Sequence, residues 1–172
     1  MTAPEVVVRS ERPEDAGAVR AVNLAAFETA TEADLVDALR AQASGVVSLV
    51  AERDGAVVGH ILFSPVLLGA HPELRIAGLA PMAVVPACQR QGIGSALVRA
   101  GLERCRALGY GAIVVLGHPT YYPRFGFTPS APRGIRSGYD VPDDVFMALE
   151  LQPGYLGHAS GIVAFHPAFA DA

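Results

Sequence analysis

The sequence contains no lysine and no tryptophan, and charged residues make up only 17% of its 172 positions. All 13 basic residues are therefore arginines. The net charge of −4 argues against a protein that binds nucleic acids, because contact with many backbone phosphates requires an excess of basic groups. Any phosphate that this chain binds must be held locally, by main-chain N–H groups or by single arginines. We expect no nucleic-acid partner.

The sequence also lacks a long uninterrupted apolar run, although 51% of its residues are hydrophobic. Two segments without charged residues, 55–72 and 151–170, contain several prolines and glycines, so neither provides the ~20 helix-compatible residues of a membrane span. The N-terminal residues show no basic region followed by an apolar stretch, as a signal peptide would. The two cysteines, Cys88 and Cys105, fit a reducing compartment. We expect a cytoplasmic protein without a membrane partner.

Patterns that bind metals are absent as well. The five histidines form no HxH or HxxxH pair, and the two cysteines form no cluster. We therefore predict no structural or catalytic metal. Cys88 lies beside the glycine-rich turn described below, but no His-Asp or His-Asn context accompanies it. We interpret it as a packed loop residue and not as a nucleophile.

The residues that are present predict a single mixed α/β domain. A chain of this length fits one domain, and we expect residues 1–172 to form it, with a core at about 5–151 and a C-terminal extension at 152–172. The Asp54–Gly55 pair between two apolar runs is a strong hairpin signal. The expected strands lie at about 6–9, 46–53, 56–63, 75–85, 112–116, 145–151 and 162–165, with a loop at 65–72. The expected helices begin at Pro13, after an N-cap at Thr31, and at Gln91.

The most informative stretch is LAPMAVVPACQRQGIGSAL, residues 79–97, in which a strand leads through a glycine-rich turn directly into a helix. Gly92 and Gly94 allow a ligand to approach the backbone closely, and the first N–H groups of the helix have no intrahelical partner. Together with the helix dipole, these groups predict a site for an anion such as pyrophosphate. The turn lacks the Gly-Lys-Ser/Thr of a P-loop. Leu97 stands where a dinucleotide-binding fingerprint requires a third glycine.

Further along the chain, Tyr122-Pro-Arg-Phe-Gly126-Phe127 gives the pattern Tyr-x-x-x-Gly-Phe. The turn Gln89-x-x-Gly92-x-Gly94 followed by this pattern resembles the GNAT superfamily of acetyl-CoA-dependent N-acetyltransferases. The segments GHILFSPV, QRQGIGSALVRAGL and HPTYYPRFGF are most similar to its YhbS-like bacterial subgroup, and the resemblance covers about 5–166. It implies an α/β fold with a central mixed, mostly antiparallel twisted sheet, splayed at the acyl-CoA cleft, with helices on both faces.

The resemblance implies an enzyme that uses acetyl-CoA as its cosubstrate. The acetyl group would pass to a primary amine of a small molecule or a peptide, by direct attack on the thioester. The strand before the turn would pair with the pantetheine arm, and the turn would hold the pyrophosphate. The residues implied in cofactor binding are Met82, Ala83, Val84, Gln89, Arg90, Gln91, Gly92, Ile93, Gly94 and Ser95. The alternative is a non-catalytic acyl-CoA-binding sensor or partner protein on the same fold, and a homodimer is left open.

In the same family a backbone N–H stabilises the oxyanion and a tyrosine protonates the leaving thiolate. The resemblance gives these roles to the Val84 N–H and to Tyr122 as the general acid. Tyr121 is the adjacent alternative, although its spacing to Gly126 is one residue too long. Arg90 and Arg99 are candidates for side-chain contact with phosphate. His118 is a candidate for contact with the adenosine end, because the asparagine that relatives often carry in its region is missing.

The sequence leaves the general base open. An alkyl amine has a pKa of about 10, so a proton must leave before the amine attacks. Many family members carry a glutamate on the strand before the turn, and this chain has none there. Glu73, just upstream, is one base candidate; Glu28 and His60 are the others. Two acidic segments either attract a cationic amine or form solvated surface, and they comprise Glu28, Glu32, Asp34 and Asp37 in the first and Asp140, Asp143 and Asp144, with Tyr139, in the second.

Overall fold

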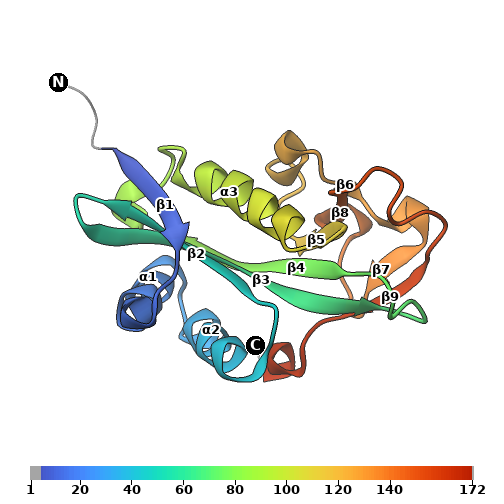
Figure 1. The fold of residues 1–172 in the computed structure, drawn as a ribbon, viewed down its shortest axis with the longest axis horizontal. Helices are drawn as coiled ribbons and strands as arrows, with labels where there is room; N and C mark the ends of the chain where they lie inside the picture. The colour runs from blue at the N-terminus through green and yellow to red at the C-terminus, as the bar shows by residue number, and fades with distance from the viewer. Residues whose placement is uncertain (1–4, 172) are drawn as a thin grey trace.

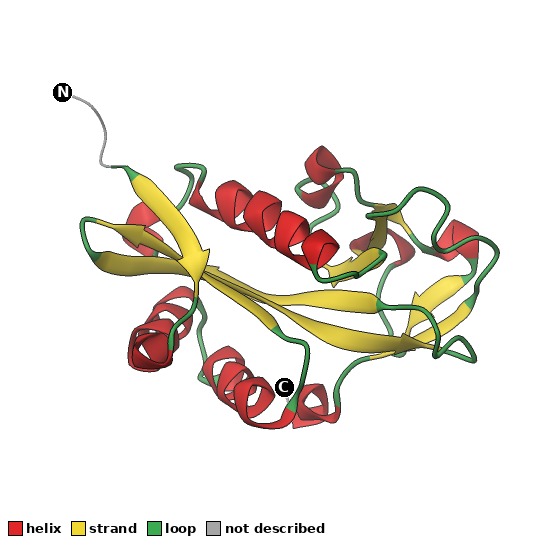
Figure 2. Ribbon diagram, in the orientation of Figure 1, coloured by secondary structure: helices red, strands yellow, loops and turns green. Residues whose placement is uncertain are grey.

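The computed structural model describes residues 5–171, in which one nine-stranded sheet carries helices on both faces (Figure 1, Figure 2). The strands are β1 (Val6–Ser10), β2 (Val47–Arg53), β3 (Ala56–Leu68), β4 (Ile76–Val84), β5 (Ala112–Leu116), β6 (Thr128–Pro129), β7 (Ile135–Ser137), β8 (Phe146–Glu150) and β9 (Gly161–Ala164). The α-helices are α1 (Ala16–Ala26), α2 (Thr31–Gln42) and α3 (Ile93–Ala107). Short 3-10 helices are η1 (Pro13–Asp15), η2 (Pro86–Cys88), η3 (Tyr122–Phe125), η4 (Ala131–Arg133), η5 (Asp143–Val145) and η6 (Pro167–Asp171). None of the helices within the described range is long and apolar enough to cross a membrane.

The strands follow the order β1-β2-β3-β4-β5-β8-β6. Strand β9 pairs with the end of β3 and carries β7 on its other side. The pairs β4–β5 and β7–β9 are parallel, and the other pairs are antiparallel. Asp54 and Gly55, both with positive φ, form the turn between β2 and β3. The mixed, mostly antiparallel sheet with helices on both faces that the sequence predicts is confirmed.

Each face of the sheet has its own apolar core. Helix α3 covers one face, and α1 and α2 cover the other (Figure 1). On the α3 face, Gly101 lets the helix backbone approach the sheet, since a Cβ placed there would lie 2.2 Å from the ring of Phe63. On the opposite face, α1 and α2 pack their apolar stripes on β2 and β3. The residues of that second core are Val19, Leu35, Val36, Leu39, Val50 and Leu62.

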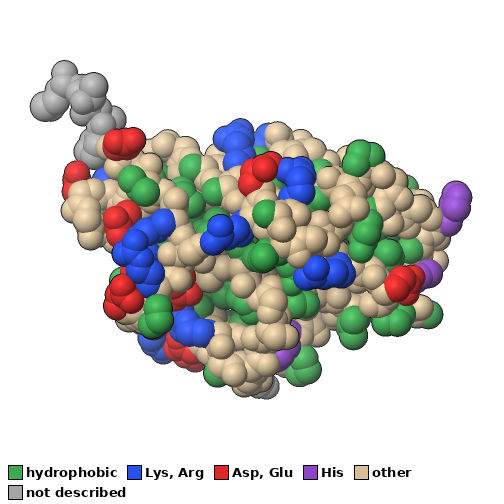
Figure 3. Space-filling view, in the orientation of Figure 1, with side chains coloured by type: hydrophobic (Ala, Val, Ile, Leu, Met, Phe, Trp, Pro, Cys, Tyr) green, Lys and Arg blue, Asp and Glu red, His purple; other side chains and the backbone are tan. Residues whose placement is uncertain are grey.

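Charged side chains lie mainly outside these cores, and many pair with opposite charges. Arg20 contacts Asp34, and Arg136 contacts Asp143, both at 2.9 Å. On the face of the molecule shown in Figure 3, arginines lie among acidic, apolar and neutral polar side chains. Basic groups on that face therefore do not gather into one broad positive surface.

Two local expectations from the sequence are wrong. Strand β3 continues to Leu68, so the first part of the expected loop at 65–72 is strand, because β4 and β9 both pair with it. Thr31 is the first residue of α2 and not its N-cap; Ala30 holds that position without a side-chain hydrogen bond. The C-terminal extension contributes β9 to the sheet, and its η6 packs against α2.

Strand β4 contains one extra residue relative to β3, and this feature positions the site. Ile61 pairs with Met82 and Phe63 with Leu79, so two steps on β3 match three on β4. The extra residue changes which side chains face α3. Before it, the side chain of Leu79 faces α3; after it, the side chains of Met82 and Val84 do. A strand otherwise alternates its faces with a period of two residues. The irregularity therefore falls at Ala80–Pro81.

Candidate functional site

Strand β4 separates from β5 where the extra residue lies. Their parallel pairing ends at Leu79 and Val115, and β4 continues to Val84 paired with β3 on its other side. The Val85 N–H donates to the Val58 carbonyl of β3, at 2.9 Å. Because backbone direction alternates along a strand, the N–H groups of Met82 and Val84 then point away from β3, towards the gap. A free strand edge in such a gap can pair with an extended ligand.

The turn after β4 presents unpaired backbone donors to the same end of the gap. Gly92 is the N-cap of α3 with φ +85°, a conformation that favours glycine. The Ala96 N–H donates to the Gly92 carbonyl at 3.0 Å, so the N–H groups of residues 93–95 precede the first helical hydrogen bond. These three donors and the positive end of the helix dipole form an anion site.

Side chains of the turn hold its shape. The Gln89 amide donates to the Val84 carbonyl at 2.9 Å, which ties the turn to the end of β4. The Gln91 amide donates to the Ala87 carbonyl at 3.2 Å, and its oxygen accepts from Arg53 Nη1 at 2.8 Å. The side chains of both glutamines thus form hydrogen bonds within the protein, and the donors that remain for a ligand are main-chain N–H groups.

A cavity of about 460 Å³ lies over this turn, lined by Val84, Cys88, Gln89, Arg90, Gly92, Gly94, Ser95, Tyr121 and Arg124. It brings together six of the ten residues that the sequence predicts for cofactor binding. Of the others, Ile93 is buried in the α3 core, and Met82 packs beside Gly94. Ala83 is paired with His60, so its backbone groups point towards β3.

Tyr121 and Arg124 also line this cavity, and the sequence reasoning gave neither of them a binding role. Tyr121 Oη lies 3.1 Å from Ser95 Oγ, at the first turn of α3. The Arg124 guanidinium stacks 4.4 Å above the Tyr121 ring, and its Nε donates to the Tyr121 carbonyl at 2.9 Å. Arg124 therefore brings a positive charge to the anion site. The sequence feature that could have identified Arg124 is its position within the Tyr-x-x-x-Gly-Phe motif.

Tyr122 lies deeper than Tyr121: it is part of the α3-face core, and only Tyr121 of the two lines the cavity. Its ring packs on Gly117, directly after β5, where a Cβ would lie 2.3 Å from the ring. The side chain is 7% exposed, and burial raises the pKa of its phenol to about 12. The phenol is therefore protonated at neutral pH, as a proton donor must be.

The three base candidates from the sequence occupy different places. Glu73 precedes β4, at the opposite end of the strand from Val84, and pairs with His71 at 3.4 Å. Glu28 is exposed between α1 and α2. His60 is fully buried, and burial lowers its pKa to about 3. The structure brings neither Glu73 nor Glu28 into contact with the turn of α3.

Comparison with known proteins shows which family has this architecture. Residues 16–127 match the model of the acetyltransferase (GNAT) family. The chain belongs to the GNAT acetyltransferase family. The uncharacterized N-acetyltransferase YjhQ of Escherichia coli K12 is 40% identical over 156 residues, which are 84% of this chain and 85% of YjhQ. The resemblance read from the two motifs is thereby confirmed.

Two solved structures of GNAT proteins are similar over nearly the whole chain. YhbS from Escherichia coli, in complex with CoA, superposes with a TM-score of 0.92 at 34% identity, covering 99% of this chain and 94% of YhbS. A GNAT family acetyltransferase from Brucella melitensis, in complex with acetyl-CoA, gives 0.80 at 41% identity, covering 97% and 99%. The fold of this GNAT acetyltransferase is therefore that of proteins crystallised with the free and the acetylated form of CoA.

The remaining candidates of this GNAT chain lie outside the gap or pack beside it. Arg99 stacks 5.3 Å from the ring of Phe125, and His118 is exposed after β5. Cys88 is half-buried, with its sulfur 3.8 Å from Arg53 Nη1. Among residues 5–171 no three His, Cys, Asp or Glu side chains gather as metal ligands would.

Proposed function

We propose that this GNAT chain transfers the acetyl group of acetyl-CoA to a primary amine, on a small molecule or a peptide. The observation that carries the proposal is the unpaired edge of β4, which leads directly into the donor-rich turn of α3 and its cavity. The complexes of the two similar structures with CoA and acetyl-CoA support the same ligand here.

In this proposal the main chain and arginines hold acetyl-CoA. The pyrophosphate accepts hydrogen bonds from the N–H groups of residues 93–95, with Arg90 and Arg124 adding charge from the cavity wall. The pantetheine arm pairs with the free edge of Met82 and Val84. The complete lack of lysine is compatible with this site, because backbone donors form most of it.

The amine attacks the thioester carbon directly, and two groups stabilise the products of that attack. The Val84 N–H points into the gap and donates to the developing oxyanion. Tyr122 donates its phenolic proton to the leaving sulfur, and its raised pKa, about 12, keeps that proton available at neutral pH. Tyr121 is the competing donor, since it lies nearer to the turn of α3. Glu73 precedes β4, at the opposite end of the strand from Val84, so we do not assign the general base to it.

Two measurements test the proposal. Isothermal titration calorimetry should detect binding of CoA to the purified chain. Release of free thiol from acetyl-CoA should then require a primary amine from a panel of alkyl amines, arylalkyl amines and peptides with a free α-amine. Lack of CoA binding would contradict the cofactor site. CoA binding without turnover on the whole panel would favour the alternative, an acyl-CoA-binding sensor, for which the missing strand glutamate is the motivating observation.

Three further expectations from the sequence complete the proposal. Limited proteolysis should yield one resistant core, if residues 1–172 form a single domain. Size-exclusion chromatography with light scattering should distinguish a monomer from a homodimer. Cell fractionation should recover the protein in the cytoplasm, as its cysteine content leads us to expect.

A further inference from the structure

Arg53 connects the hairpin of β2 and β3 to the turn before α3. It is the last residue of β2, and it is half-buried. Leu49 and Ala51 of the same strand belong to the α3-face core, so the alternation of the strand directs Arg53 to that face as well. There its Nη1 atom donates to Gln91 Oε1 at 2.8 Å and lies 3.8 Å from Cys88 Sγ. A residue from a distant hairpin thus reaches the turn that forms the anion site.

The turn that Arg53 contacts has an unusual backbone. Arg90 has φ +62° and Gly92 has φ +85°, so both neighbours of Gln91 lie in the left-handed region. That region suits glycine, whereas a residue with a side chain is strained there and keeps this conformation only where other contacts enforce it. Successive N–H groups in a turn of this kind can converge on an anion. The anion site therefore depends on the contacts that hold the turn in shape.

One of these contacts ties the turn to the β2–β3 hairpin. Gln89 donates to the Val84 carbonyl, five residues before it. Gln91 donates to the Ala87 carbonyl, four residues before it. Both bonds are local in the chain, whereas Arg53 is 38 positions from Gln91 and is anchored in a strand that pairs with β1 and β3. Because Arg53 binds the oxygen of the Gln91 amide, it directs the nitrogen of that amide towards Ala87.

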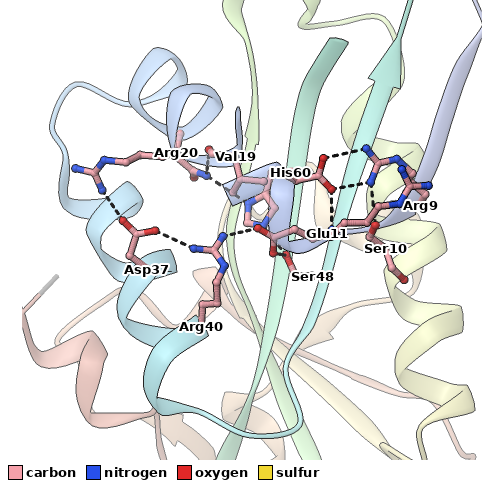
Figure 4. A network of polar contacts seen from close by, with 12 residues as sticks. Arg9, Ser10, Glu11, Val19, Arg20, Asp37, Arg40, Ser48 and His60 are labelled. Atoms are coloured by element: carbon pink, nitrogen blue, oxygen red, sulfur yellow. Dashed lines mark hydrogen bonds and ion pairs between the residues drawn. The ribbon is translucent and has the colours of Figure 1, made fainter. Parts of the chain in front are cut away.

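The charge of Arg53 is not neutralised within the protein. Arginines far from the turn contact acids: Arg40 contacts both Glu11 and Asp37, and Arg20 also contacts Asp37 (Figure 4). No ion pair among residues 5–171 includes Arg53. Its Nε is buried and, within the same residues, has no hydrogen-bond partner. A partly buried charge without a counter-ion is unfavourable in the free protein, which indicates a role in binding an anion.

One side chain separates Arg53 from the cavity over the turn. Cys88 contacts Arg53 and also lines the cavity. Gln91 lies between Arg90 and Gly92, which line the cavity as well. A charge acts across such a distance, and it is screened less where protein lies between the two charges than where water does. The guanidinium therefore makes the cavity more positive without lining it.

We propose that Arg53 is a positioning residue for the pyrophosphate of acetyl-CoA and that it favours acyl donors that carry phosphate; this inference rests on the proposed cofactor site. Arg53 holds the turn through Gln91, and its charge attracts the phosphates. The groups assigned to the chemical step, the Val84 N–H and Tyr122, belong to other elements. We therefore expect the loss of Arg53 to weaken cofactor binding and to leave the transfer step unchanged.

Removal of the charge tests the inference. Arg53→Gln should raise the Kd for CoA, measured by calorimetry, about 10-fold. Arg53→Met, which keeps an apolar stem, is a second variant without the charge and should show the same loss. Arg53→Lys keeps the charge and should recover most of the affinity. Arg104→Gln is the matched control: Arg104 is exposed in the last turn of α3, about 16 Å along the helix from Ile93, and its loss should leave Kd unchanged. Thermal melting establishes that each variant is folded.

Salt and a truncated donor distinguish attraction of phosphate from a purely structural role. Between ~0.05 M and ~0.5 M NaCl, the Kd of the wild type for CoA should rise more than that of Arg53→Gln, because salt screens the charge that the variant lacks. With acetyl-CoA, Arg53→Gln should raise KM about 10-fold and keep kcat within about twofold. With S-acetylpantetheine, which has no phosphate, the two proteins should have equal kcat/KM. An equal loss with both donors, or an equal salt dependence, would overturn the role of the charge.

A double-mutant cycle tests the contact with Gln91. Gln91→Ala should weaken CoA binding, because it releases both Arg53 and the Ala87 carbonyl. If Arg53 acts in part through Gln91, the loss in the double variant should be smaller than the product of the two single losses. Independent effects would contradict positioning through Gln91.

The outcomes separate this inference from the proposed function. A wild-type chain that binds CoA as tightly as its folded Arg53→Gln and Arg53→Met variants do not need to exceed would overturn the role of Arg53 and leave acetyl transfer intact. A wild-type chain that does not bind CoA would overturn both. A chain that binds CoA and acetylates no amine would contradict the proposed reaction, and the calorimetric comparison of the variants would still decide the role of Arg53.

Discussion

On the α3 face of the sheet, polar side chains around the turn bond to the protein itself: Gln89 holds the Val84 carbonyl and Gln91 holds the Ala87 carbonyl. On the α1 and α2 face, Asn23, Glu32 and Ser64 each keep an oxygen without a partner. Among the described residues, the unpartnered buried atom near the turn is a donor, Arg53 Nε, whereas those on the opposite face are an amide oxygen, a carboxylate oxygen and a hydroxyl. The buried polar atoms without a partner therefore differ in kind between the two faces.

The two faces also hold their helices by different means. Helix α3 approaches the sheet through Gly101 and Phe63, an apolar contact. Helix α1 starts at an ion-pair network in which Arg9 contacts Asp15 at 2.7 Å and Glu52 at 2.6 Å. Packing is insensitive to pH, whereas an ion pair requires ionised partners. The α3 face is thus held by apolar packing, whereas the stability of the start of α1 depends on charge.

The largest effect should come from the adjacent pair Tyr121 and Tyr122, whose rings lie 5.1 Å apart. Tyr122→Phe removes the proposed proton donor and should lower kcat by about 10²–10⁴-fold, with CoA affinity unchanged. Tyr121→Phe is the matched control, because it removes a hydroxyl beside Ser95 at the cofactor turn. It should weaken CoA binding slightly and keep kcat. Steady-state kinetics with calorimetry distinguishes the two, and the reverse pattern would assign the acid to Tyr121.

Gly101→Ala should destabilise the α3 face more than any change on the exposed surface. The new Cβ would lie 2.2 Å from the Phe63 ring, which is fully buried. Overpacking of this kind costs about 1–3 kcal/mol in the free energy of unfolding. Urea denaturation should show this loss equally at pH 7 and at pH 5. A loss that varied with pH would contradict a purely apolar contact.

Asp15→Asn should destabilise the α1 face in a pH-dependent manner. The hydrogen bond and charge of Arg9 lower the pKa of Asp15 from 3.8 to about 2. A lowered folded-state pKa means that ionised Asp15 stabilises the fold above about pH 4, and that this contribution disappears as the pH falls towards 2. The variant should therefore melt below the wild type at pH 7, and the two melting temperatures should converge on acidification. Asp34→Asn, at an exposed ion pair, should follow the wild type throughout.

The smallest expected changes in the free energy of unfolding have opposite signs on the two faces of the sheet. Gln89→Ala removes the bond to the Val84 carbonyl and should cost about 0.5–1.5 kcal/mol of stability. Ser64→Ala removes a buried hydroxyl without a partner, so it should be neutral or slightly stabilising in the free protein. Chemical denaturation checks both signs; a destabilised Ser64→Ala would mean that the hydroxyl has a partner within the protein.

The turn of α3 could be predicted from the sequence, and the unpartnered buried oxygens of the opposite face could not, for a physical reason. The turn of α3 is a local structure: Gly92, Gly94 and the helix that follows are contiguous, so their spacing specifies the backbone donors. Asn23, Glu32 and Ser64 are distant in the chain, and only the topology of α1, α2 and β3 brings them to one face. Within its acidic segment, Glu32 could be separated from Asp34 only once the buried stripe of α2 was known.

The strand predictions show the same limit. The Asp54–Gly55 hairpin was correct because a two-residue turn has a specific chemistry. The end of β3 was missed because its residues 64–68 are strand by virtue of partners, β4 and β9, that lie elsewhere in the chain. The extra residue of β4 could not be predicted from the sequence of β4 either, because it is defined only by the register of β4 against β3.

The extra residue in β4 exchanges the two faces to which its side chains point, and this exchange does not depend on which residue types follow it. Side chains at 82 and 84 contribute to the α3 core, and the backbone N–H groups of these two residues face the gap whichever apolar residues stand there. Sequence drift can therefore alter the packing of this segment without closing the gap, whereas the loss of one residue would restore the alternation of an unbroken strand. The separation of β4 from β5 is thus set by the length of β4 and not by the identity of its side chains.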